Sequence, residues 1–152
     1  MIEPMLDARP VRDALSEQLE RFRSKLEAAI QRKLAGEVLR TRSGALAASI
    51  ISSIENSHSK SIVAISSSGL PYAAIQEFGG KTKAHEILAV NSKALTFRAG
   101  GDLVFAKNVS HPGSTLPARS YLRSSLNDIR NELRPTLKQA IVDALAQNAS
   151  TA

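Results

Sequence analysis

The chain has 152 residues, of which 43% are hydrophobic and 22% charged, with a formal net charge of +6 and no Cys. This length predicts a single domain over residues 1–152, large enough to bury a core without disulfides or metals. The lack of Cys excludes a disulfide scaffold, a zinc ribbon, an iron–sulfur site and a thiol nucleophile. No stretch approaches the roughly 18 uninterrupted apolar residues that span a bilayer, so no membrane partner is expected.

The first predicted element is a long amphipathic helix over residues 10–39. Its apolar residues recur every three or four positions, and charges of alternating sign lie between them. The apolar stripe consists of Val11, Leu15, Leu19, Phe22, Leu26, Ile30 and Leu34. Pro10 suits the first turn, where a helix needs no amide donor. Such a rod is longer than a small core requires, so we expect it to lie along a sheet or a neighbouring subunit.

A second helix is predicted over residues 44–55, after the helix-breaking segment 41–44. Leu46, Ile50, Ile51 and Ile54 follow at helical spacing. Residues 61–66 alternate between small polar and β-branched side chains, which predicts a strand.

Residues 61–117 are predicted to hold the sheet and its loops. The segment 72–78 fits two helical turns that stop at Gly79-Gly80. Strands are predicted over 94–98 and 103–107, because each carries apolar residues at alternate positions and a Gly-Gly-Asp turn joins them.

The last part of the chain is predicted to be a helical segment over residues 118–146. An earlier strand is predicted over 86–90, and residues 111–117 contain too much Pro and Gly for regular structure. Pro135 either kinks the C-terminal helix or starts a new one, and residues 147–152 are expected to fray. The order of elements predicts an α+β fold: a mostly antiparallel sheet covered by helices, with a long N-terminal and a C-terminal helix.

The sequence offers little catalytic chemistry. Nucleophile-elbow, P-loop, dinucleotide and zinc-peptidase patterns are missing. His58, His85 and His111 are far apart in the chain, so no local pair predicts a metal site. Glu77 is interpreted as a surface or capping group. We therefore expect no enzymatic activity, no catalytic residue, no metal and no cofactor.

Several ordered motifs together resemble one protein family. They are Tyr72-Ala73-x-Ile75-Gln76-Glu77-Phe78-Gly79-Gly80, Lys93-Ala94-Leu95-x-Phe97, Val104-Phe105-Ala106-Lys107-x-Val109, His111-Pro112-Gly113 and Pro117-Ala118-Arg119-x-Tyr121-Leu122, preceded by Thr41-Arg42-Ser43-Gly44-Ala45-Leu46. In this order and spacing, over residues 8–145, the chain resembles the tail-completion and head–tail joining proteins of tailed bacteriophages, the gene-ten-product-like or virion morphogenesis family. One difference is that residues 84–87 lie where that family often places a Pro-containing strand.

The resemblance implies a virion structural protein, a tail terminator or a neck adaptor, assembled in the host cytoplasm. It implies a homo-oligomeric ring, commonly of six copies, that contacts other neck and tail-tube proteins. DNA would pass through the lumen of this ring without specific binding.

Ring formation requires two different surfaces on each subunit, and loops with fixed bends are suitable candidates. The hypothesised subunit or ring interface comprises Gly79, Gly80, Lys81, His85, Ile87, His111, Pro112, Gly113, Pro117 and Arg119. Tyr72, Phe78 and Tyr121 are expected to pack inside. For Arg119, a structural salt bridge that anchors the loop before the last helix is weighed equally with a place in the interface.

The alternative function is a small basic DNA-binding protein that uses the helix over residues 10–35. The pI of about 10 favours it. However, residues 1–42, 43–110 and 111–152 each carry a net charge of +2, so the cations are not concentrated in one segment as a dedicated DNA-binding surface would require.

Overall fold

The N-terminal helix forms where the sequence has its apolar stripe. The structure, a computed structural model, describes residues 7–40, 42–57 and 60–151. Helix α1 (Arg9–Arg32) contains Pro10 in its first turn, and a π-helical turn, η1 (Lys33–Glu37), extends it. Gly36 leaves the helical region with a φ of 149°, a conformation open to glycine, and this ends the helix. The helix predicted over 10–39 is therefore confirmed as far as Glu37.

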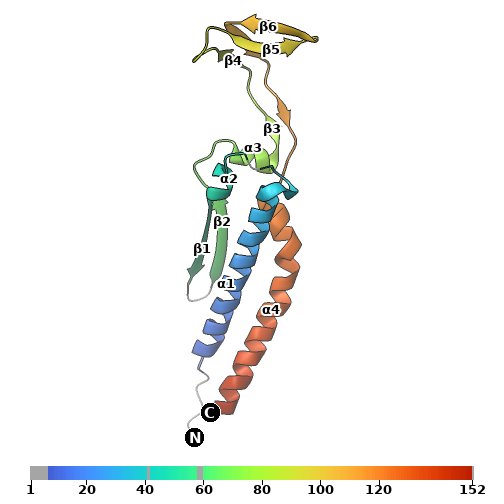
Figure 1. Cartoon of the computed structure of the whole chain (residues 1–152). Coiled ribbons are helices and arrows are strands. Elements are labelled where there is room, and N and C mark those ends of the chain that lie inside the picture. Colours follow the sequence, from blue (N-terminus) through green and yellow to red (C-terminus); the bar gives the residue numbers. More distant parts are fainter. Residues whose placement is uncertain (1–6, 41, 58–59, 152) are drawn as a thin grey trace.

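The C-terminal helix α4 (Leu122–Thr151) runs antiparallel beside α1 (Figure 1). It starts four residues after the beginning of the predicted segment 118–146. It also continues to Thr151. Residues 147–151 are therefore helical, and the expectation that they fray is wrong. Pro135 lies inside the helix and is exposed, which places its missing amide donor on the side facing water.

Residues 50–55 are strand, so the helix predicted over 44–55 is wrong in its second half. Helix α2 (Ala45–Ala48) stops after one turn, and β1 (Ile50–Asn56) pairs antiparallel with β2 (Ser61–Ser67). Isoleucine is stiff at its branched carbon and fits a pleated strand better than a helix. In the strand, Ile50 packs against the hydrophobic core. The strand predicted over 61–66 is confirmed.

The core lies between α1, α4 and the β1–β2 ladder. Its buried members are Phe22, Leu26, Ile30, Leu34, Leu39, Tyr121 and Ile129. Ion pairs tie the two long helices together at the edge of this core, from Lys25 to Glu132 and from Lys33 to Asp128. The apolar stripe of α1 thus finds its partner within its own chain.

After the short helix α3 (Ala73–Phe78), the segment that precedes α4 extends away from the helices as a long two-stranded ribbon (Figure 1). Three antiparallel ladders follow one another along it: β3 (Gly80–Lys81) with β8 (Thr115–Leu116), β4 (His85–Leu88) with β7 (Asn108–His111), and β5 (Leu95–Ala99) with β6 (Asp102–Ala106). We call residues 80–116 the arm, its first two ladders the stem, and β5–β6 with its turn the tip.

The α+β class with antiparallel strands and long terminal helices is confirmed. The strands predicted over 86–90, 94–98 and 103–107 are confirmed within two residues. Residues 111–117, expected to be irregular, contain the end of β7 and all of β8, because β3 and β4 supply them with backbone partners. Helix α1 lies along the β1–β2 ladder, whereas the arm extends past the helix ends (Figure 1).

Truncation of Ile30 should reveal how much this core contributes. Ile30 is only 1% exposed, so Ile30→Ala leaves a cavity between α1 and α4 and should lower the free energy of unfolding by about 3 kcal/mol. Urea denaturation followed by circular dichroism measures this. The matched control is Val142→Ala on the exposed face of α4, which should have little effect. Equal losses for both variants would contradict the position of the core.

Candidate assembly interface

The residues hypothesised as an interface all lie along the arm stem or at its root. The two segments that contain them are distant in sequence but lie on paired strands. Gly80 is opposite Leu116, and His85 is opposite His111. The structure therefore brings Gly79, Gly80, Lys81, His85 and Ile87 together with His111, Pro112, Gly113, Pro117 and Arg119. Their contact with another subunit remains a prediction.

A stacked pair of histidines stands at the end of the β4–β7 ladder that is nearer to β3 and β8. The rings of His85 and His111 lie with centroids 5.0 Å apart and planes inclined by 27°. His85 Nδ1 lies 3.1 Å from the carbonyl oxygen of Lys83, to which it donates, and His111 Nδ1 accepts from the backbone N–H of Gly113 at 3.0 Å. These bonds fix both backbone segments between the stack and the β3–β8 ladder. In the described residues, no three metal-ligating side chains come together, and His58 lies outside them.

A close backbone approach sets the bend between β7 and β8. Thr82 and Ser114 bind each other in both directions: the Thr82 N–H donates to the Ser114 carbonyl at 2.9 Å, and the Ser114 N–H donates to Thr82 Oγ1 at 2.7 Å. Gly113 has a φ of 88°, and a Cβ there would lie 2.2 Å from the carbonyl oxygen of Thr82. Only glycine fits this position.

The root of the arm is organised by one buried carboxylate, Glu77, which is 2% exposed. Its Oε2 accepts from the backbone N–H groups of Tyr121 and Leu122, at 2.7 and 2.9 Å. Its Oε1 accepts from the Ser120 hydroxyl at 2.7 Å and from the Arg123 N–H at 3.0 Å. These are the amides that the first turn of α4 leaves unpaired, so Glu77 caps a helix that begins 45 residues later in the chain.

Glu77 is held in its charged form by these bonds. Burial by itself raises the pKa of a carboxyl, but hydrogen bonds from the Ser120 hydroxyl and the amides of Leu122, Arg123 and Tyr121 outweigh burial and lower the pKa of Glu77. The Arg123 guanidinium adds an ion pair at 3.2 Å. The sequence interpretation of Glu77 is a surface or capping group. The capping role is confirmed, whereas a surface position is excluded because the side chain is buried.

Other side chains at the root are placed differently from expectation. Tyr121 is buried as expected, but Tyr72 and Phe78 are exposed, so for these two the expectation is wrong. The Arg123 guanidinium lies 4.5 Å from the ring centroid of Phe78, a cation–π contact. The ion pair considered for Arg119 is made by Arg123 instead. Arg119 donates its backbone N–H to the Gln76 carbonyl at 2.7 Å, which ties the returning strand to α3.

The register of the tip puts apolar side chains on both faces of the β5–β6 ladder. Gly100 and Gly101 form a two-residue turn with positive φ, which sets Phe97 opposite Val104 and Thr96 opposite Phe105. Directly opposed residues share a face, so Phe97 and Phe105 lie on opposite faces. Leu103 and Phe105 are 57% and 65% exposed. Sequence reasoning missed this surface because the alternation in each strand does not reveal their mutual register.

The part of the chain that the structure describes contains no helix long and apolar enough to cross a membrane. No family model matches the sequence, and neither curated proteins nor solved structures give a significant match.

Substitution of Glu77 should weaken the arm root. Glu77→Gln keeps the shape but removes the charge and turns an NH2 toward amide donors, so we expect a loss of about 2–3 kcal/mol in the free energy of unfolding at pH 7. Because the folded pKa lies below the ordinary value of 4.5, the carboxylate contributes fully above that pH and progressively less as the pH falls through its folded pKa.

Urea denaturation at pH 7 and at pH 3 should therefore give a gap between wild type and Glu77→Gln that narrows in acid. Glu132→Gln is the matched control, because Glu132 makes an exposed ion pair with Lys25. A gap that does not depend on pH, or a control that loses as much as Glu77→Gln, would contradict the capping role.

Gly113→Ala should open the stem. The added Cβ clashes with the Thr82 carbonyl in a backbone conformation that disfavours alanine, so the hydrogen bonds between Thr82 and Ser114 should break. Hydrogen exchange of the Thr82 and Ser114 amides should accelerate at least tenfold, while amides of α1 change little. Gly69→Ala is the control, since it shares a positive φ but meets open space. Unchanged exchange would contradict the close approach.

Proposed function

We propose that this chain is a non-enzymatic structural protein of a tailed-phage particle that completes the tail or joins it to the head. In this proposal it assembles into a ring of six copies around the DNA channel and contacts neck and tail-tube proteins. The resemblance of its ordered motifs to tail-completion and head–tail joining proteins supports the proposal. The proposal covers both roles that the resemblance implies, tail terminator and neck adaptor.

The observation that carries the proposal is the large uncovered surface of the monomer. The chain exposes 11442 Å². A compact monomer of 16.3 kDa is expected to expose about 7,500 Å². The arm contributes to this excess, because it extends past the helices as a two-stranded ribbon (Figure 1). Its side chains Leu88, Leu103 and Phe105 are exposed. Apolar surface of this kind is typical of a subunit that is buried in an assembly.

The charges of α1 weigh against the DNA-binding alternative at that helix. Arg21 pairs with Glu17, and Arg23 pairs with both Glu20 and Glu27. Lys25 and Lys33 pair with carboxylates of α4. Cations neutralised within the protein are less available to phosphates.

The observation that favours the DNA-binding alternative is the charge of the arm. The arm carries Lys81, Lys83, Lys93, Arg98 and Lys107 against Glu86 and Asp102. Binding to a random duplex in about 150 mM salt separates the two functions. A dissociation constant below about 1 μM that weakens steeply with salt would favour DNA binding.

Deletion of the gene from its phage or prophage tests the assembly function. We expect heads and tails that fail to join, or tails of abnormal length, and a loss of infectious particles. A wild-type copy supplied in trans should restore infectivity, and so should the surface variant Val142→Ser. Electron microscopy and plaque counts are the measurements. Intact, infectious tailed particles without the gene would refute the proposal.

A further inference from the structure

We propose that the tip of the arm stacks on the β1–β2 ladder of a second copy of this chain. The inference rests on the proposed ring and deepens it, since it assigns the two surfaces that meet. The donor is one face of the β5–β6 ladder, which we call the tip face: Thr96, Arg98, Leu103 and Phe105. The acceptor is the outer face of β1–β2, on the side away from the core: Ile51, Ser53, Glu55, Ile62, Ala64 and Ser66.

The tip face is the side of the hairpin that its own chain leaves less covered. Thr96 is opposite Phe105, and Arg98 is opposite Leu103, so these two pairs share a face. Leu103 and Phe105 are exposed. The other face holds Asp102 near the turn and three half-buried side chains, Leu95, Val104 and Ala106. A partner on the tip face therefore meets two apolar side chains and one guanidinium.

The outer face of β1–β2 is an exposed sheet surface that holds a carboxylate. Its side chains alternate along the strands with Ile50 and Ile65, which pack against the core. Ile51 and Ile62 are exposed on it. Glu55 is the charged residue of this face, and Lys60 in the adjoining turn lines a hollow beside α1 instead. The outer face is therefore apolar at two positions, small at three and negative at one.

The two faces match when they stack with both turns pointing the same way. The pair nearest the turn on the tip face, Arg98 with Leu103, then lies on Glu55 with Ile62. The guanidinium meets the carboxylate, and the leucine meets the isoleucine. One pair further along, Phe105 lies on Ala64, whose small side chain leaves room for the ring within the roughly 10 Å that separates stacked sheets.

The handedness of the chain permits this superposition. The Ser68 N–H donates to the Ser49 carbonyl at 3.1 Å, so the pairs of the outer face are hydrogen-bonded pairs, since such pairs alternate along a ladder. The two-residue turn makes Ala99 and Asp102 a hydrogen-bonded pair, so the tip face consists of non-hydrogen-bonded pairs. In a chain of L-residues viewed with the turn upward, the first strand is on opposite sides in these two kinds of face. The first strands therefore superpose when the faces meet.

The charges at this contact are complementary. In the described part of the chain, neither Arg98 nor Glu55 has an ion pair within its own molecule. A charge-assisted bond between them is about twice as strong as a bond between neutral groups. The pair also fixes the register, because a shift by one pair along the strands would set Arg98 on Ser53 and leave Glu55 without its partner.

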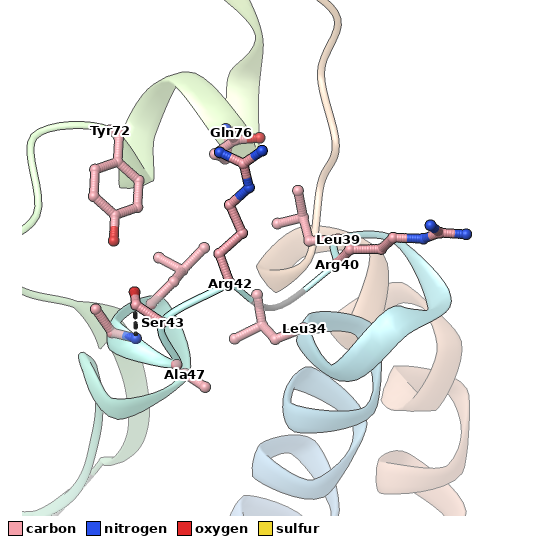
Figure 2. Close-up of a pocket in the computed structure, with 11 residues that line it drawn as sticks. Leu34, Leu39, Arg40, Arg42, Ser43, Ala47, Tyr72 and Gln76 are labelled. Carbon is pink, nitrogen blue, oxygen red and sulfur yellow. Dashed lines mark hydrogen bonds between the residues drawn. The ribbon is translucent and has the colours of Figure 1, made fainter.

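The hollow beside α2 does not offer the same match. This cavity has a volume of about 420 Å³, and Leu34, Leu39 and Tyr72 contribute to its lining (Figure 2). The Arg42 guanidinium lies beside Gln76 at its rim (Figure 2). A cation in this position would repel the guanidinium of the tip face, which favours the outer face of β1–β2 as the acceptor.

The partner is a second copy because the chain itself contains the complementary face and its own tip is out of reach. The stem directs the tip away from β1–β2 (Figure 1). The two faces differ, so the contact is heterologous, and every copy is donor to one neighbour and acceptor from the next. The tip face has only four side chains, so one contact is smaller than the about 800 Å² per partner of a standard interface. Closure into a ring holds each copy at two contacts and compensates for this.

Cross-linking tests the contact directly, because the natural chain has no Cys. Thr96→Cys with Ser53→Cys places two thiols that face each other in the stacked arrangement and leaves the charged and apolar side chains of the tip face unchanged. A bis-maleimide that spans the roughly 10 Å between stacked sheets should give covalent multiples of 16.3 kDa.

The matched control is Ala99→Cys with Ser53→Cys, because Ala99 is exposed on the other face of the same strand. We expect the facing pair to give at least about fivefold more cross-linked product than this control, since docking raises the effective concentration of the two thiols. Equal yields from the two double variants would overturn the proposal.

Charge reversal in the facing Cys variant tests the ion pair. Arg98→Glu should lower the yield to that of the control, because two carboxylates then meet, and the addition of Glu55→Arg should restore it. Arg134→Glu, on the exposed surface of α4, is the matched charge change and should leave the yield unaltered. Circular dichroism verifies that each variant folds. A yield that does not respond to Arg98→Glu, or that Glu55→Arg does not restore, would contradict the contact.

Failure of this contact and failure of the proposed function are separable. Cross-linked multiples, together with infectious particles that form without the gene, would refute the virion role and leave the contact standing. Gene-dependent particles without cross-linked multiples would overturn the contact alone and assign the tip to a different protein of the particle.

Discussion

The arm and the long C-terminal helix depend on one buried carboxylate. Glu77 sits at the last turn of α3 and satisfies three backbone amides at the start of α4, while the same short helix leads into β3. The cap therefore fixes where α4 begins, where the arm departs and how both meet the core at Tyr121. A buried charge is tolerated here because its hydrogen bonds and the helix dipole replace the water that it has lost.

The stem transmits this anchoring to the tip through backbone contacts. Its ladders are short, and the His85–His111 stack and the approach of Gly113 to Thr82 hold them in line. Few side chains are buried along it, so its stability comes from hydrogen bonds that water competes for, and local opening should cost less there than in the helical core. A projecting arm of this kind is suited to reaching a neighbour, because its ends are fixed while its apolar tip stays free to be covered.

Much of the fold could be predicted from local patterns. The stripe from Val11 to Leu34 specified α1, and the alternation around the Gly100-Gly101 turn specified the hairpin. The error at residues 50–55 arose because Leu46, Ile50, Ile51 and Ile54 satisfy a helical period, whereas their branched side chains pack better in a strand paired with β2. Strands β3 and β8 of the stem were missed because they are two residues long and carry no hydrophobic alternation.

The sequence by itself determined the long helices, the hairpin of the tip, the α+β class and the segment where glycines and prolines fix the backbone, since these follow from periodicity and allowed dihedral angles. The tertiary structure decided which distant groups meet: Glu77 with the start of α4, the two halves of the stem, and the face on which Phe105 lies. The physical reason is that pairing register and the capping of α4 by a residue 45 positions earlier depend on three-dimensional contacts, which a local pattern does not encode.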